Sequence, residues 1–461
     1  MMNGSMFQPK RKERNWKRFI VYFIILFFTF QFLKLIYQLL FPNVIQSTVN
    51  QDQHVDYKEK TYYNNKQQNI LYFYQDNQTY FDFPWYQTKH TRPQYRPNSN
   101  LTTTHLTLKE RDILQQKAVL QAKKLAYRRF PKEDYETSIK GSTTVNTLEK
   151  TIAFRKRLDC WLKRGHWIRD DGKDAVYQLK HLQDPIYSTC DAQFYKTHSK
   201  DEKREAIKYR WQPAEECRFE HQLNLEQWCH ILQGRHMLLV GDLVHYQFHE
   251  ILLDAFRDDP TVCFGELNCK DHTICKSPRD TRLRYIRNDV LSTIRKFQNR
   301  ERGHPLANII EWPFVTSNIL SSYPILILSR SAILGDDDLS FTRRLIQTLK
   351  VIRETSPDTL VIYRSTFIGH PFCDDAHGPL QEVLKDEELR KLPYGWSEIK
   401  RRNAIAQAVV EAAGGVYLDL AAMIDLRPDG HVGGQDCLRY CIPGPLDATV
   451  QILYHVFLEL L

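Results

Sequence analysis

The C-terminal two thirds of this 461-residue chain predict an α/β domain whose parallel sheet is covered by helices on both faces. Three observations support this fold class. Short apolar runs alternate there with amphipathic helical patterns, which is typical of strand–helix–strand units. All ten cysteines lie at or after Cys160, and 42% of the chain is hydrophobic, enough for a sizeable core. A mean hydropathy of −0.51 excludes a multi-span membrane protein, and no internal repeats are present.

The alternation begins with a predicted strand at 236–240, followed by a helix at 244–257 with its apolar side chains on one face. In chain order, the later predictions are a strand at 324–328, a helix at 341–354, a strand at 359–364, a helix at 397–413, a strand at 416–420 and a helix at 446–461. In sheets of this kind, functional sites lie at the carboxyl ends of the strands.

The N-terminus predicts a membrane anchor. Residues 19–41 form a mostly apolar stretch that would reach about 34 Å as a helix, enough to cross a bilayer. Residues 1–18 carry six basic side chains against Glu13, which predicts a cytoplasmic tail. A cleaved signal peptide is the alternative, but the run is long and no small-residue cleavage site follows Pro42. We therefore expect an uncleaved signal anchor and a type II single-pass topology.

Residues 42–157 are predicted to form a luminal stem. Residues 43–105 are rich in Asn, Gln, Thr and Tyr, whereas 106–130 have helix-forming composition. A stem helix and a coiled coil both fit that second segment. Asn77 and Asn100 each begin a glycosylation sequon, which is compatible with a glycoprotein of the secretory lumen.

The net charge of +9 is unevenly distributed along the chain. Residues 160–461 carry 38 Lys and Arg against 42 Asp and Glu, so the positive excess lies entirely in the tail, anchor and stem. This distribution indicates membrane orientation, and a stem that meets acidic glycan or lipid. It gives no support to nucleic-acid binding.

The ten cysteines predict up to five disulfides, because the secretory lumen is oxidising. Their pairing cannot be deduced from their spacing. Zinc binding is the alternative, but the sequence contains no Cys-x-x-Cys pair, and we predict no metal site.

Two segments lie where a site is expected, namely Val240–Leu243 after the first strand and Asp436–Gly444 before the last helix. Together with other landmarks they resemble the PC-esterase, or trichome-birefringence-like, family of polysaccharide O-acetyltransferases over about residues 158–461. The landmarks are Cys160 with Gly165-His166-Trp167, Tyr209-Arg210-Trp211-Gln212-Pro213 with Cys217, Tyr363-Arg364-Ser365 with Gly369-His370-Pro371 and Cys373, Arg427-Pro428-Asp429-Gly430-His431, and Asp436-Cys437 through Cys441-Ile442-Pro443-Gly444-Pro445-Leu446-Asp447.

This resemblance implies a flavodoxin-like SGNH fold, a Golgi type II membrane protein and acetyl transfer to glycan hydroxyls. In the family, a serine in Gly-Asp-Ser forms an acyl-enzyme, and a histidine in Asp-x-x-His is the general base. No metal or cofactor is implied beyond an acetyl donor as co-substrate. The matching triad positions here are Leu243, Asp436 and Arg439, and the matching pocket positions are Gly241, Asp242, Arg364, His370 and His431.

The chain departs from the family pattern at two triad positions. Leu243 has no lone pair with which to attack an acetyl donor, and Arg439 stays protonated at physiological pH. Loss of a nucleophile costs about 10⁴–10⁶ in rate in well-studied triads. Residues 329–333 also stand where relatives carry Asn-x-Gly-x-His.

Two functions therefore remain open. One is an O-acetyltransferase or esterase that uses unconventional catalysis. The other is a pseudoenzyme that binds glycan or partners an active paralogue. The residue chemistry favours this second function, because neither Leu243 nor Arg439 can play its part in a triad.

Substitute chemistry is conceivable but not favoured. His245 and His249 are predicted to be ordinary helix-face histidines, and His431 to have a structural role near the site. We expect Arg439 to form an ion pair with Asp436, which would keep the pocket while removing the base.

The run Asp336–Asp338 could hold the metal of a glycosyltransferase, a distant third function, but it is better explained as a helix N-cap region. We predict that the basic runs at 343–344 and 400–402 are solvated helix faces.

Overall fold

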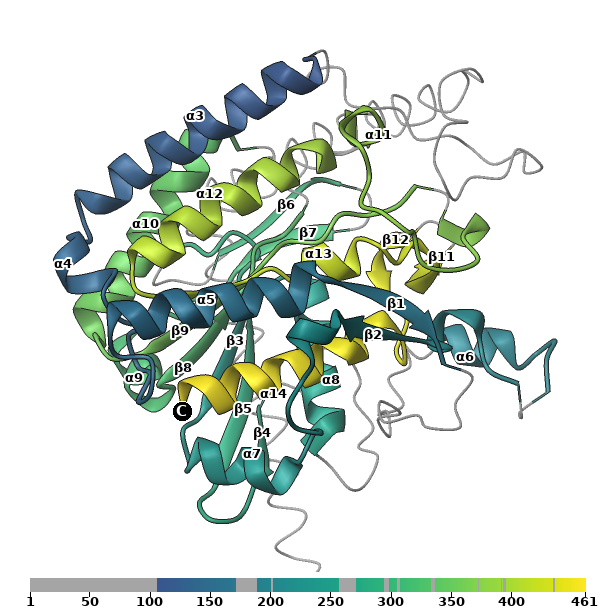
Figure 1. The fold of residues 1–461 in the computed structure, drawn as a ribbon, viewed down its shortest axis with the longest axis horizontal. Helices are drawn as coiled ribbons and strands as arrows, with labels where there is room; N and C mark the ends of the chain where they lie inside the picture. Colours follow the sequence, from purple (N-terminus) through teal and green to yellow (C-terminus); the bar gives the residue numbers. More distant parts are fainter. Residues whose placement is uncertain are drawn as a thin grey trace, which may run out of the picture. The chain divides into compact units, whose positions relative to one another are not determined.

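The computed structural model describes residues 106–170, 189–199, 202–256, 271–293, 298–304, 307–332, 336–371, 373–390, 392, 395–433 and 436–461 (Figure 1). The predicted anchor at 19–41 and both sequons lie outside these residues. Within them, no helix has the length and apolarity that a membrane span requires.

A six-stranded sheet forms the centre of the domain, in the order β10-β9-β8-β3-β5-β4. Five strands run parallel, and β4 pairs antiparallel at one edge. The parallel strands have the flavodoxin-like order 2-1-3-4-5, so the predicted fold class is confirmed. The bounds are β3 (Met237–Gly241), β4 (Asp271–Cys275), β5 (Thr281–Arg287), β8 (Ile325–Leu328), β9 (Leu360–Arg364) and β10 (Val416–Leu418).

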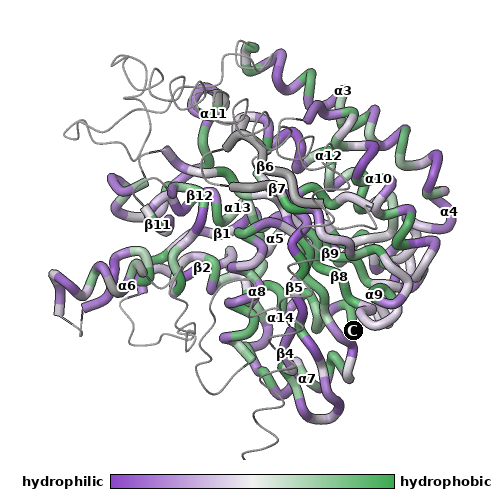
Figure 2. Tube along the Cα trace, turned by 180° about the vertical axis from the view of Figure 1, so that it is seen from behind, coloured by the Kyte–Doolittle hydropathy of each residue, from purple (hydrophilic) through white to green (hydrophobic). Residues whose placement is uncertain are grey.

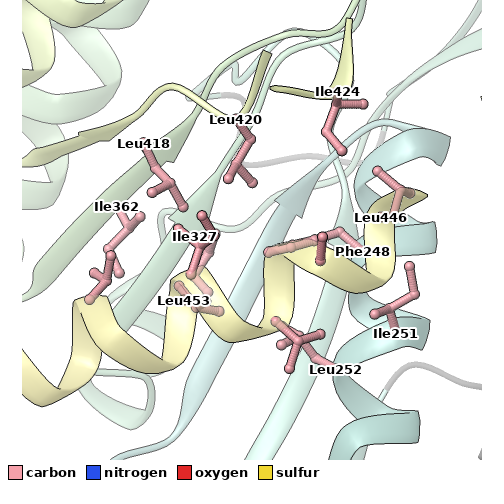
Figure 3. Packing of buried hydrophobic residues seen from close by; sticks show 14 of the residues in the cluster. Phe248, Ile251, Leu252, Ile327, Ile362, Leu418, Leu420, Ile424, Leu446 and Leu453 are labelled. Carbon is pink, nitrogen blue, oxygen red and sulfur yellow. The ribbon is translucent and has the colours of Figure 1, made fainter. Parts of the chain in front are cut away.

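Helices cover both faces of the sheet because its central strands are apolar on both sides. On one face, Leu239, Ile327 and Ile362 pack in one cluster with α5 (Leu148–Lys163), α8 (Leu243–Phe256) and α14 (Ala448–Leu460). Figure 3 shows Phe248 and Ile251 of α8 and Leu453 of α14 converging over the strands.

On the other face, alternate strand residues such as Leu238, Leu326 and Val361 pack in a second cluster with α3, α10 and α12. These helices span Leu108–Tyr127, Asp338–Thr355 and Ile399–Ala412. The two clusters lie on either side of the sheet since successive strand side chains point to opposite faces. Figure 2 shows the hydrophobic strands inside and mostly hydrophilic residues along α3.

Helix α3 corresponds to the helix predicted at 106–130. It begins with a capping box in which Thr107 and Glu110 each bond the other's backbone N–H. Ala122 and Ala126 are buried, and these small side chains let α3 lie close against α12 and α10. The helix is therefore part of the domain's own packing.

The remaining elements are short. Two antiparallel pairs flank the sheet, namely β1 with β2 and β11 with β12, and a third pair is formed by β6 and β7. Their bounds are Gly165–Arg169, Tyr209–Pro213, His431–Gly433, Asp436–Tyr440, Gln298–His304 and Ala307–Glu311. The short helices are α4 (Lys132–Tyr135), α6 (Thr189–Phe194), α7 (Leu225–Leu232), α9 (Ser317–Ser322), α11 (Asp386–Arg390) and α13 (Ala421–Ile424).

Eight cysteines form four disulfides, in agreement with the prediction of a disulfide-rich domain. The pairs are Cys160–Cys217, Cys190–Cys441, Cys229–Cys275 and Cys373–Cys437, and Cys263 and Cys269 lie outside the described residues. Two pairs hold the ends of β12, because Cys437 lies within it and Cys441 follows it.

Candidate functional site

The first site segment is the turn between β3 and α8, at the carboxyl end of the central strand. Asp242 caps the helix, and its Oδ1 accepts a hydrogen bond of 3.0 Å from the backbone N–H of His245. Position 241 has room only for glycine, since a Cβ there would lie 2.7 Å from Cβ of His245. Leu243 is the first residue of α8, and it is half-buried.

The second site segment is β12, which carries Asp436 and Arg439. Oδ2 of Asp436 pairs with Nε of Arg439, and Oδ1 accepts the backbone N–H of Arg439 at 3.1 Å. The side chain of Asp436 is 10% exposed and that of Arg439 is 26% exposed. The ion pair expected from the sequence is therefore present at Oδ2, and the backbone N–H of Arg439 bonds the other oxygen of the carboxylate.

Gln247 joins the two segments. Its side-chain amide donates to the carbonyl of Tyr440 and accepts the backbone N–H of Tyr440 at 3.0 Å. Because Gln247 lies one helical turn after Leu243, these two bonds bring β12 against the start of α8. Gln247 could not be singled out from the sequence, because Glu250 and Asp254 are further polar residues on the same helix face.

Arg364 lies beneath this junction, at the end of β9, and is 1% exposed. Its Nε donates to Nδ1 of His245 at 3.1 Å, its Nη1 donates to the carbonyl of Ser365 at 3.0 Å, and its Nη2 lies 3.8 Å from Oδ1 of Asp242. The guanidinium also lies over the ring of Phe367. Burial raises the pKa of Asp242, while Arg364 and the cap bond from His245 act in the opposite direction.

Both ring nitrogens of His245 are occupied, because Nε2 lies 2.9 Å from the carbonyl of Ile327 while Nδ1 accepts from Arg364. Burial, and then the charge of Arg364, lower the pKa of His245 well below its usual value, so the ring is neutral. This residue has no free lone pair for rescue chemistry. His249 is buried too, so both of these helix-face histidines lie inside the domain. The reason is that α8 lies between the sheet and β12.

His370 and His431 lie together next to β12. Nδ1 of His370 is 2.7 Å from Nε2 of His431, and Nδ1 of His431 is 3.2 Å from the carbonyl oxygen of Arg439. Burial lowers the pKa of His431 to about 3 and that of His370 well below its usual value. The structure thus places the predicted residues on connected segments. Leu243 lies on α8, Asp436 and Arg439 lie on β12, and the histidine pair lies beside β12.

The end of β8 contributes Ser329 and Arg330, next to the end of β3. The backbone N–H of Ser329 donates to the carbonyl of Val240 at 2.9 Å. Arg330 is buried, pairs with Asp336 and lies over the ring of Phe341. A buried cation is therefore held at the end of β8.

The three predicted N-cap carboxylates at 336–338 lie at the start of α10. Asp337 is the N-cap, and its Oδ1 accepts the N–H of Ser340 at 2.8 Å. Asp338 pairs with Arg401 at 2.7 Å, and Arg402 donates to the carbonyl of Asp336. In the described part of the chain, no group of three or more His, Cys, Asp or Glu side chains could hold a metal ion.

The prediction that residues 400–402 form a solvated face was wrong for two of them. Arg401 is 9% exposed and Arg402 is 8% exposed, whereas Lys400 is exposed. The carboxylates of Asp338 and Glu398 bind Arg401 where the N-termini of α10 and α12 meet. This meeting of two helix ends is a long-range contact that a charge run does not reveal.

Comparisons with known proteins give limited but consistent similarity. No family model matches the chain. The chain is 27% identical to xyloglucan O-acetyltransferase 2 of Arabidopsis thaliana over 92 residues, which are 18% of this chain and 22% of that protein. The chain thus matches less than a quarter of that relative's length. A match to a solved structure of a peptidoglycan O-acetylesterase covers 51% of this chain and 95% of that chain. Its TM-score is 0.30 and the sequence identity is 12%.

Proposed function

We propose that this chain is a glycan-directed protein of the polysaccharide O-acetyltransferase type whose own acetyl-transfer site is impaired. The similarity to a xyloglucan O-acetyltransferase and the ordered landmarks at residues 160–447 support the substrate class. The observation that carries the proposal is the Asp436–Arg439 ion pair, bonded through Gln247 to the helix that begins at Leu243.

The geometry explains the impairment in chemical terms. Acyl transfer through an acyl-enzyme needs a nucleophile and a base that can take its proton. At the start of α8, Leu243 offers only methyl groups, and the guanidinium of Arg439 neutralises the one carboxylate that could orient a base. What remains at the rim of the site is the partly exposed guanidinium of Arg439, which can bind glycan hydroxyls.

In the same proposal, the protein is a Golgi type II membrane protein, anchored by residues 19–41, whose C-terminal domain lies in the lumen. The topology argument from residues 1–41 and the four disulfides support this location. An active paralogue is the partner that would supply acetyl transfer. The glycosyltransferase alternative has no support, because Asp336 and Asp338 are paired with arginines.

Activity and binding measurements on the purified full chain test this proposal. We expect no turnover of a chromogenic acetyl ester, and no acetyl transfer to xyloglucan oligosaccharides, above the rate of heat-denatured chain. We expect the oligosaccharides to bind and Arg439→Ala to weaken binding about tenfold, since a charge-assisted hydrogen bond contributes about 1.5 kcal/mol. Arg343→Ala, at an exposed position of α10, is the matched control.

Two outcomes would contradict the proposal in different ways. Turnover by the parent chain that Asp436→Ala abolishes would show that the site is active. Equal binding by the parent and by Arg439→Ala would show that glycan does not contact this rim.

A further inference from the structure

The histidine pair beside β12 forms a continuous chain of contacts between two backbone carbonyls. Nε2 of His370 lies 2.9 Å from the carbonyl oxygen of Asp425, and the ring nitrogens facing each other lie 2.7 Å apart. Nδ1 of His431 then lies 3.2 Å from the carbonyl oxygen of Arg439. His370 is 0% exposed and His431 is 6% exposed, so the contacts lie away from solvent.

The number of protons decides how many of these contacts are hydrogen bonds. A carbonyl oxygen only accepts, so each outer ring nitrogen must carry a hydrogen to bond it. The contact between the two rings needs one hydrogen more. Three hydrogens are required in total, whereas two neutral imidazoles carry only two. The neutral pair therefore leaves one contact without a hydrogen.

We infer that His370 and His431 are positioning residues that form a proton-controlled connection between the Asp425 turn and β12. With two ring hydrogens, the connection ends at His431. With three, it extends to the carbonyl of Arg439 and fixes the strand that carries Arg439 and Asp436. This inference does not depend on whether the site transfers acetyl groups, because it concerns only the strand that carries these residues.

We assign the missing hydrogen of the neutral pair to the longest of the three contacts. The shorter carbonyl contact, to Asp425 at 2.9 Å, is the better hydrogen bond, so Nε2 of His370 holds one hydrogen. Nε2 of His431 holds the other and donates to Nδ1 of His370. Nδ1 of His431 is then a bare nitrogen 3.2 Å from the carbonyl of Arg439, the longest contact of the three.

The groups around the pair favour the neutral form near neutral pH. Burial lowers the pKa of both rings, and His431 lowers that of His370 further, while the backbone at Arg439 and Leu438 acts in the opposite direction on the pKa of His431. Tyr440 of β12 stacks on His431 with ring centroids 4.3 Å apart, and Oδ1 of Asp425 accepts the N–H of Ile368. The charge of Arg439 is compensated by Asp436, and Asp374 lies beside Gly433 of β11.

The third bond would act on β12 between two points where other contacts fix the strand. At Cys437 the strand is fixed by the disulfide to Cys373 and by a 2.9 Å bond from the N–H of His370. Tyr440 is fixed by Gln247. The carbonyl of Arg439 lies between these supports, so its bond to His431 controls how firmly the Arg439 backbone is held.

Nitrogen NMR of the full chain labelled with ¹⁵N-histidine tests the proton count. At neutral pH we expect both rings to carry hydrogen on Nε2 and Nδ1 of His431 to be bare. On acidification we expect one proton to arrive at that nitrogen while the chain stays folded. His370→Asn and His431→Asn assign the signals, and His455→Asn, at a buried histidine that bonds its own helix, is the control.

Hydrogen exchange of the Arg439 and Tyr440 amides, corrected for the intrinsic effect of pH, gives the second measurement. We expect about fivefold more protection in the acid form of the parent, the effect of one added hydrogen bond. We expect no such gain in His431→Asn and an unchanged gain in His455→Asn. A hydrogen on Nδ1 of His431 at neutral pH would overturn the inference, as would unfolding before proton uptake or an equal gain in His431→Asn.

Discussion

Arg364 is the single residue on which the described site most depends. Its guanidinium lies within the core, where it bonds His245 and lies near the carboxylate of Asp242. A buried carboxylate is costly unless a cation or several donors compensate it. The turn that presents Leu243 is therefore stable only with this arginine in place.

Replacing Arg364 with methionine should destabilise the fold by about 3–5 kcal/mol, since Asp242 would be left as an uncompensated buried charge. Urea unfolding of the full chain measures this change. Arg343→Met, at an exposed position on α10, should stay within about 0.5 kcal/mol of the parent. A loss for Arg364→Met no larger than that of the control would show that Asp242 does not need the cation.

The buried histidines should make the fold sensitive to acid. Burial lowers the pKa of His245, His370 and His431 below 6.5, their usual value, so the unfolded chain binds protons that the folded chain refuses. Their contribution to stability is full above about pH 6.5 and is lost as the pH falls below it. Asp289 acts in the opposite direction, because burial raises its pKa from 3.8 to about 7, so its contribution falls as the pH rises through that range.

A comparison of variants isolates the histidine effect. The melting temperature of the parent should fall more steeply between about pH 7 and pH 5 than that of His370→Asn combined with His431→Asn. Parallel profiles for the two proteins would contradict the assigned direction of the pKa shifts.

At the scale of elements, the sequence predicted the parts with clear periodicity. The strands at β3, β8, β9 and β10 and the helices α8, α10, α12 and α14 were found within a few residues of their bounds. β5, with polar residues between its apolar ones, and the pairs β1–β2 and β11–β12 were missed. The missed strands lack the continuous apolar run of β3, β8 and β9, and pairing between distant segments sets their position.

The N-cap of α10 gives a direct test of one predicted element. Asp337→Ala should cost about 1 kcal/mol, because the backbone N–H of Ser340 loses its acceptor. Asp337→Asn keeps a cap and should change stability by only a few tenths of that. Thermal or urea unfolding of both variants measures the difference, and equal losses for both would mean that charge, and not capping, is what matters there.

The bond between α8 and β12 is testable in the same way. Gln247→Leu removes both partners of the Tyr440 backbone and should destabilise the fold by about 2–5 kcal/mol, since two buried groups lose their hydrogen bonds. Gln407→Leu, on a half-buried face of α12, is the matched control. Urea unfolding measures both, and a cost no greater than that of the control would mean that β12 is held without Gln247.

At the scale of the whole molecule, composition and alternation were enough for the α/β fold class, and the landmarks singled out two segments that the structure joins through Gln247. They could not show that Arg401 and Arg402 are buried, or that His370 and His431 meet across 61 residues. Both depend on which helix ends and loops approach each other in space. Most of the positive excess of the chain lies before residue 106, since residues 106–461 carry 51 Lys and Arg against 49 Asp and Glu.

We propose that α8 and β12 are the remnant of an acetyl-transfer site in which Leu243 and Arg439 stand in place of the nucleophile and the base. The most direct measurement is acetyl-ester hydrolysis by the double variant Leu243→Ser with Arg439→His, in which Asp436 is kept to orient the new histidine. We expect hydrolysis at least about 10²-fold above the parent, and its loss when Asp436→Ala is added. A double variant that folds, with the parent's disulfides and melting profile, yet hydrolyses no faster than the parent would contradict the claim.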